Sequence, residues 1–219
     1  MTNTLHRYGS AGSFSDDYVF FALPCKGKND QGAVDKLREF LSICAKHEPT
    51  NLGNSDYGGY RPAENLGPSV HWKREQGPDF AGVIAGVHRT ATAAAVFDTS
   101  EKAEACLREL IDADLGLSVN VSASVDAAKE LANECGNARH SVEYSLGFLD
   151  RHDRLPDRRV LELATMCGHG MVSSNMAKKM LDMVREGRRS PQEAAATMAR
   201  FCPCGVYNPA RAKRLLEEG

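Results

Sequence analysis

An internal repeat constrains this chain more than any other feature of its 219 residues. Residues 156–181 and 191–216 align without a gap, and seven of the 26 aligned positions are identical. A segment that recurs in this way predicts two copies of one supersecondary unit, which stack and bury their apolar faces against each other. We therefore expect residues 150–219 to form an all-helical module built from two similar units.

Helix-start signals place two helices in each copy of the repeat. Ser190 and Glu193 have the spacing of a capping box around Pro191, which suits the first turn of a helix. Ser173 and Asn208 occupy equivalent positions of the two copies, and both residue types cap helix N-termini. Each copy is therefore predicted to be a helix, a short glycine-containing loop and a second helix.

The loop in the middle of each copy carries a pair of potential metal ligands. Cys167 and His169 in the first copy correspond to Cys202 and Cys204 in the second. Thiolates and imidazole are ligands of zinc and of iron–sulfur clusters. Both loops directly precede a helix N-terminus, which stabilises negative charge. If the two loops meet, the repeat predicts a metal site with three cysteines and one histidine.

The residue types leave the metal open. An iron–sulfur cluster could use the three loop cysteines with His169 or Cys25 as the fourth ligand, or with one iron left open. Zinc would be held by the three cysteines and His169. Copper(I) or nickel is less well supported. In an interpretation without metal, the repeat is a packing duplication, because cysteine is also a common buried residue. Cys44 and Cys106 lie on apolar helix stripes and are assigned to the core.

Residues 17–149 predict an α+β domain, preceded by a polar segment, 1–16, that we expect to be poorly ordered. The spacing of apolar residues predicts strands and helices in alternation. We expect strands at 18–24, 80–87, 91–97, 117–122 and 140–148, and helices at 31–46, 98–113 and 125–135. The first six elements have the βαββαβ order of a ferredoxin-like sheet, which the final α-β pair would extend by one strand.

The long segment 48–80 is a candidate active-site lid or interface, because it contains five glycines and four prolines and shows little periodicity. If the protein is an enzyme, aromatic and cationic side chains in and after this segment could hold an anionic substrate. The candidates for substrate binding are Tyr60, Arg61, His71 and Arg74. The candidates for catalysis are His88, Arg89 and the loop residue His169.

Charge and motifs exclude several functional classes. The net charge is −2, but residues 151–219 carry +5 and residues 1–150 carry −7. The basic residues are scattered over helix faces, which disfavours nucleic-acid binding. The sequence contains no G-x-G-x-x-G after a strand, no Walker A motif, no G-x-S-x-G and no H-E-x-x-H. No run approaches the roughly 18 apolar residues of a membrane span, and no signal-peptide core is present, so we expect a cytoplasmic protein.

These observations predict a metal-binding protein that recognises a small anionic molecule and could form a homodimer. The first hypothesis is an iron–sulfur or zinc enzyme, an oxidoreductase or a lyase, with its centre at the two repeat loops. The second hypothesis is a non-catalytic metalloprotein. In that case the zinc or cluster would be structural or redox-sensing, and the ferredoxin-like domain would mediate oligomer or partner binding.

Overall fold

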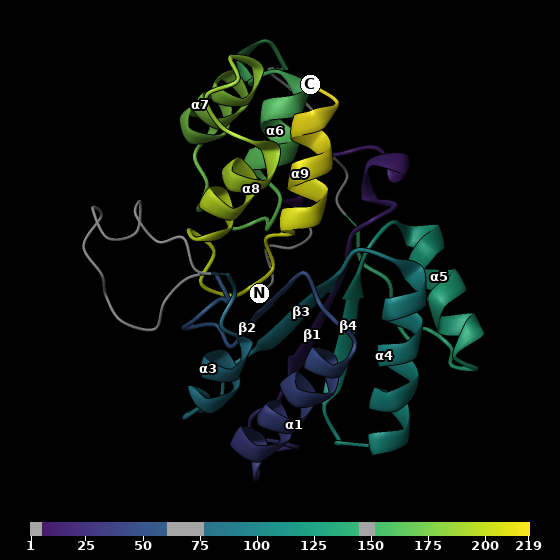
Figure 1. Cartoon of the computed structure of the whole chain (residues 1–219). Coiled ribbons are helices and arrows are strands. Elements are labelled where there is room, and N and C mark those ends of the chain that lie inside the picture. Colours follow the sequence, from purple (N-terminus) through teal and green to yellow (C-terminus); the bar gives the residue numbers. More distant parts are fainter. Residues whose placement is uncertain (1–5, 61–76, 145–151) are drawn as a thin grey trace.

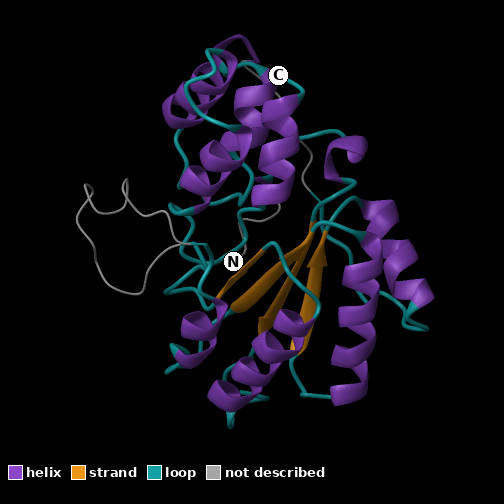
Figure 2. Cartoon of the chain, in the orientation of Figure 1, coloured by secondary structure: helices purple, strands orange, loops and turns teal. Residues whose placement is uncertain are grey.

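The computed structural model describes residues 6–60, 77–144 and 152–219 and shows a mixed α+β fold. A four-stranded antiparallel sheet lies between two groups of helices, and the C-terminal helices form one of these groups (Figures 1 and 2). The strands are β1 (Tyr18–Leu23), β2 (Asn51–Gly53), β3 (Ala93–Phe97) and β4 (Ser118–Ser122). The α-helices of the described residues are α1 (Ala33–Lys46), α3 (Phe80–Ala85), α4 (Ser100–Ala113), α5 (Val125–Glu134), α6 (Arg158–Ala164), α7 (Ser174–Arg185), α8 (Pro191–Ala199) and α9 (Pro209–Glu217).

The sheet has the strand order β2-β3-β1-β4, and its two faces contribute to two different cores. On one face, Phe20 and Phe97 pack with the apolar sides of α1 and α4. On the other face, Val19 and Val96 pack with α6–α9. Burial on both faces explains why β1 and β3 read as continuous apolar runs, whereas β4, with Val119 and Val121 on one face only, alternates.

Most elements of the α+β part form where the sequence predicts them. The strands expected at 18–24, 91–97 and 117–122 and the helices expected at 31–46, 98–113 and 125–135 all exist, with ends that differ by a few residues. These segments are long enough for the pattern of their apolar side chains to identify the element type.

One of the predicted strands is wrong, and another does not form over the part of it that the structure describes. Residues 80–87 contain the helix α3, whose N-cap Asp79 accepts a hydrogen bond from the backbone N–H of Gly82. A short apolar run is compatible with either a strand or a buried helix, so only packing decides between them. Residues 141–144 are exposed and form no strand, and the rest of the expected strand 140–148 lies outside the described residues. The second strand of the sheet is instead the three-residue β2, which is too short to show a pattern.

The C-terminal part has the predicted architecture of two helix–loop–helix units. The side chains of Ser173, Ser190 and Asn208 cap α7, α8 and α9, and Ser190 and Glu193 complete the capping box. Helix α6 packs on α7 and α9, while α8 packs on α7 and α9, so the two units share one core.

The loop between α8 and α9 lies directly against the edge strand β2, as the yellow-green segment in Figure 1 shows. An added Cβ at Gly53 would overlap the backbone of Cys204, and an added Cβ at Gly205 would overlap the backbone of Leu52. Asn51 strengthens the contact by donating from Nδ2 to the carbonyl oxygen of Tyr207 at 2.8 Å. Backbone therefore packs on backbone where the helical units join the sheet.

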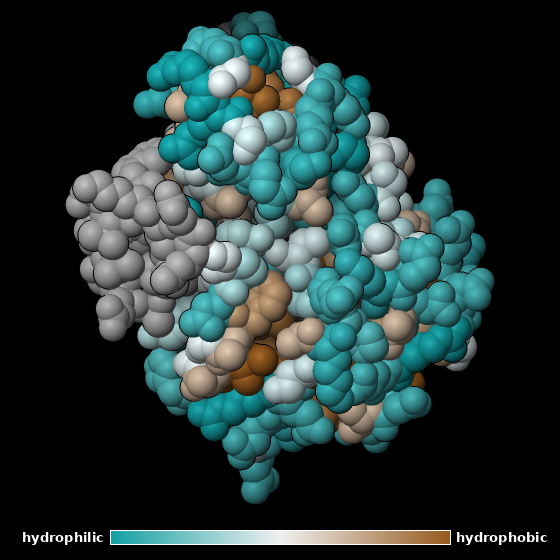
Figure 3. Space-filling view, viewed as in Figure 1, coloured by the Kyte–Doolittle hydropathy of each residue, from teal (hydrophilic) through white to brown (hydrophobic). Residues whose placement is uncertain are grey.

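None of the helices in the described part of the chain is long and apolar enough to cross a membrane. In the view of Figure 3, hydrophilic side chains cover most of the outer surface of the helices.

The backbone contact yields a test with a matched control. Gly205 (φ +66°) and Gly187 (φ +68°) both adopt the left-handed conformation, but an added Cβ at Gly187 would meet only open space. A left-handed residue other than glycine costs about 1–2 kcal/mol, and overpacking costs about 1–3 kcal/mol more. We expect Gly187→Ala to lower the free energy of unfolding by about 1 kcal/mol and Gly205→Ala by about 3 kcal/mol or more. Urea titration followed by circular dichroism measures both. Equal losses would contradict the close contact.

Candidate functional site

The two repeat loops meet, and their three cysteines and one histidine form a closed ring of contacts. Cys202 Sγ lies 3.6 Å from Cys204 Sγ, and Cys204 Sγ lies 3.5 Å from His169 Nδ1. Cys167 is hydrogen-bonded to both Cys202 and His169 and so completes the ring. The repeat thus brings together the four residues that the sequence singled out as a ligand set.

The ring is largely shielded from water. Cys167 and Cys202 are fully buried, Cys204 is 6 % exposed, and His169 is half-buried. The ring therefore reaches solvent mainly through the imidazole.

The pKa values of the three thiols in the ring differ because the thiols are buried and hydrogen-bonded to one another. The hydrogen bond with Cys202, together with burial, raises the pKa of Cys167 well above its ordinary value. The hydrogen bond with Cys167 lowers the pKa of Cys202, but the hydrogen bond with Cys204 and burial outweigh it and raise this pKa to about 12. The hydrogen bond with Cys202 lowers the pKa of Cys204. Cys204 is thus the thiol of the ring that ionises most readily.

The four side chains of the ring contact one another, but this arrangement is not a metal coordination shell. Among the residues that the structure describes, no group of three or more His, Cys, Asp or Glu side chains is arranged to hold a metal ion. The four side chains would have to turn toward a common point to share one.

A buried ionic network lies next to the ring. Arg211 Nη1 lies 2.9 Å from Asp17 Oδ2, and the guanidinium of Arg7 forms an ion pair with the same carboxylate. Both guanidinium groups stack on the ring of Phe14, with distances of 4.1 Å for Arg211 and 4.9 Å for Arg7. Arg211 Nη1 also lies 3.8 Å from the sulfur of Met166, the neighbour of Cys167.

Two buried cations thus share the buried carboxylate of Asp17. Burial and the charge of Arg211 lower the pKa of Arg7 to about 9, while a charge on Cys167 acts in the opposite direction. Burial also lowers the pKa of Arg211 to about 10. A negative charge at the ring would therefore be electrostatically favoured by this network.

Sequence reasoning missed the network, because three of its members lie in or next to the segment for which we expected little order. Residues 6–16 contain the 3-10 helix Ala11–Phe14 and contact α9 through Ser13 and Arg211. Residues 1–5 lie outside the described residues. An available signal was Phe14, a large apolar residue in a mostly polar segment.

The other predicted site residues are not joined to the ring by any hydrogen bond or ion pair of the described residues. Cys25 is exposed in the turn after β1. His88 is exposed and contacts the carbonyl oxygen of Gly86, and Arg89 pairs with Asp56. Tyr60 packs at the edge of the core that contains the ring, and burial raises its pKa. Arg61, His71 and Arg74 lie outside the described residues.

Comparison of the chain with protein-family models, curated proteins and solved structures finds no match.

The buried network makes a prediction about stability. Asp17→Asn removes the one carboxylate that is ion-paired directly with both Arg7 and Arg211, and breaking a buried ion pair costs about 3–5 kcal/mol. We expect the free energy of unfolding to fall by that amount, as measured by urea titration. Asp182→Asn removes one carboxylate from the exposed pair Lys178–Asp182 and should change stability by less than about 0.5 kcal/mol. A small effect of Asp17→Asn would show that the network is not ion-paired in solution.

Proposed function

We propose that this protein binds one metal ion, which by ligand type is zinc, through Cys167, His169, Cys202 and Cys204. The observation that carries the proposal is the closed ring of contacts between these four side chains, which come from two loops 35 residues apart in the sequence. In this function the ion fastens the two helix–loop–helix units to each other and to strand β2.

The distances in the ring support a tetrahedral site. Bond lengths of about 2.3 Å for Zn–S and 2.0–2.1 Å for Zn–N give tetrahedral edges of about 3.8 Å between two sulfurs and about 3.5 Å between sulfur and nitrogen. The Cys202–Cys204 and Cys204–His169 separations are 3.6 and 3.5 Å. Metal binding requires side-chain rotations. They must bring the ligand atoms of the two diagonal pairs of the ring, Cys167–Cys204 and Cys202–His169, to these same tetrahedral edge lengths.

Charge supports the same proposal. A zinc ion with three thiolates and one neutral imidazole has a net charge of −1. The adjacent network of Arg7, Arg211 and Asp17 has a net charge of +1 within the buried interior. The two opposite charges would offset each other, which reduces the cost of burying either one.

The close spacing of the sulfurs favours a single ion over a cubane cluster. In a [4Fe–4S] cluster each cysteine binds a different iron, so ligand sulfurs are spread around the cluster rather than in contact. The burial of three of the four ligands fits a closed, structural site, and the half-buried His169 is the position at which a ligand could exchange.

We also infer that the sheet and two of its helices form a ferredoxin-like unit. The elements β1, α1, β2, β3, α4 and β4 follow one another in the βαββαβ order of that plan, with α3 inserted between β2 and β3. The antiparallel pairing of β1 with both β3 and β4 supports this inference.

Metal content tests the proposal. We expect protein purified without oxygen to contain one zinc per chain by mass spectrometry of the metals and to be colourless. Cys202→Ala should remove the metal, because a structural site needs all four ligands. Cys106→Ala is the matched control, since Cys106 is equally buried but contacts Cys44 in the other core, and it should keep the metal.

The alternatives give different results in the same experiment. If the protein instead contains iron and sulfide and absorbs visible light, the same ligands hold an iron–sulfur cluster and not zinc. Protein without any metal, even after incubation with zinc or with ferrous iron and sulfide, would refute the proposal and leave the cysteines as packing residues.

Metal removal also makes a prediction about stability. Because a structural ion binds the folded state more tightly than the unfolded chain, a chelator should lower the melting temperature of the wild-type protein. The melting temperature of Cys202→Ala should not change with chelator, whereas that of Cys106→Ala should fall as in the wild type. Calorimetry with and without chelator measures all three.

A further inference from the structure

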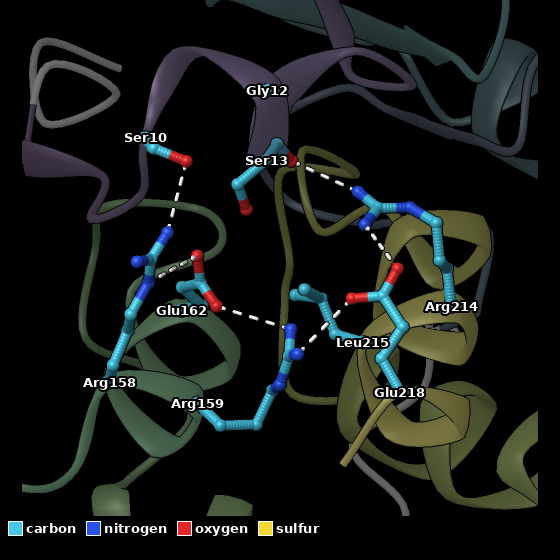
Figure 4. Close-up of a pocket in the computed structure, with 9 residues that line it drawn as sticks. All are labelled: Ser10, Gly12, Ser13, Arg158, Arg159, Glu162, Arg214, Leu215 and Glu218. Carbon is cyan, nitrogen blue, oxygen red and sulfur yellow. Dashed lines mark hydrogen bonds and ion pairs between the residues drawn. The ribbon is translucent and has the colours of Figure 1, made fainter.

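A polar pocket of about 500 Å³ lies between the 3-10 helix Ala11–Phe14, α6 and α9. Figure 4 shows arginines from two different helices around this space: Arg158 and Arg159 come from α6, and Arg214 comes from α9. The volume is in the range of small-molecule sites. The pocket lies at the N-terminal end of α6 and the C-terminal end of α9, whereas the cysteine ring lies at the opposite ends of these helices.

A carboxylate already lies between two of these arginines. Arg214 Nη1 lies 3.0 Å from Glu218 Oε1, and Arg159 Nη2 lies 3.1 Å from Glu218 Oε2. Each guanidinium thus binds a different oxygen of one carboxylate, and the two guanidiniums are spaced to hold a single oxyanion between them.

Both arginines also have partners other than Glu218. Asp16 accepts from Arg214 Nε at 2.8 Å and from Nη2 at 2.6 Å, and the carbonyl oxygen of Ser13 accepts from Nη2 at 3.1 Å. Arg159 is held by the buried carboxylate of Glu162, with Nη1 3.3 Å from Oε2. The two groups are therefore preorganised by partners other than the one between them, which lowers the cost of binding a ligand.

Glu218 lies at the C-terminal end of the chain segment that forms α9. It follows the last residue of α9, and its side chain is 46 % exposed. Helix ends fray at low free-energy cost. Apart from Glu218, the ion pairs of Arg158, Arg159 and Arg214 in the described residues are with Glu162 and Asp16, so three cations share two carboxylates.

We propose that this pocket binds a small molecule through a carboxylate or phosphate group, which takes the place of the Glu218 carboxylate between Arg159 and Arg214. A carboxylate presents a planar pair of oxygens and a phosphate presents several oxygens. A guanidinium binds either group through two parallel N–H donors. Glu218 then acts as an internal competitor that the ligand displaces. The site does not depend on the proposed metal, because it shares no residue with the cysteine ring.

The test uses the full chain and two probes, inorganic phosphate and succinate, in isothermal titration calorimetry at constant ionic strength. Removing an internal competitor raises affinity by a factor set by its effective concentration, so we expect Glu218→Gln to bind at least one probe about tenfold more tightly than the wild type. Glu217→Gln is the matched control: it removes the same charge one residue earlier on α9, from a side chain that is also 46 % exposed but pairs with Lys213. It should bind like the wild type.

A second substitution identifies the binding group. Arg159→Met in the Glu218→Gln background should abolish the gain, and circular dichroism confirms that the protein is folded. If that variant does not fold, Arg158→Met replaces it, because the Arg158 side chain is 62 % exposed, and it should weaken binding several-fold. Tighter binding of phosphate would indicate a phosphorylated ligand, and tighter binding of succinate a carboxylate ligand. Equal affinities of Glu218→Gln and Glu217→Gln for both probes, or no saturable binding of either probe, would overturn the proposal.

Discussion

The contact between the Cys-Pro-Cys-Gly loop and strand β2 is the constraint on which the rest of the structure depends. It brings the main chain of Cys204 and Gly205 against that of Leu52 and Gly53, with no side chain in between. This close approach fixes the second helix–loop–helix unit on the sheet. Because the first unit shares a core with the second, it also determines where Cys167 and His169 lie.

The cysteine ring and the buried charges next to it form one electrostatic unit. Arg7 and Arg211 share the carboxylate of Asp17 and stack on the ring of Phe14, so the charges of these three ionic residues sum to +1. Buried charge is tolerated only where an opposite charge or a hydrogen bond compensates it. The proposed zinc–thiolate centre supplies such a charge, so the N-terminal segment and the repeat loops would stabilise each other.

The two candidate sites use the same helices in different ways. Each repeat places its loop at one end of the helices, and there the cysteines and the histidine meet. At the other end, α6 and α9 present arginines that are paired with acidic residues and surround a pocket. A ligand at that pocket would contact both helix–loop–helix units, because α6 belongs to the first and α9 to the second. The packing of α6 on α9 therefore positions both sites.

Sequence periodicity was informative where a segment was long or repeated. Strong apolar patterns predicted β1, β3, β4, α1, α4 and α5, and capping residues predicted the starts of α7, α8 and α9. It failed at residues 80–87, where an apolar run of eight residues fits a strand as well as the helix that forms. It also failed at β2, whose three residues show no pattern.

The sequence by itself determined the helix–loop–helix repeat and the identity of the four residues that its loops bring together, because both are local patterns of residue type and spacing. Only the tertiary structure decided that the loops meet above β2, that Arg7, Asp17 and Arg211 are buried beside them, and that Arg159 and Arg214 converge on one carboxylate. These contacts join residues that are distant in sequence. They arise from packing and charge compensation, which leave no periodic signal in the chain.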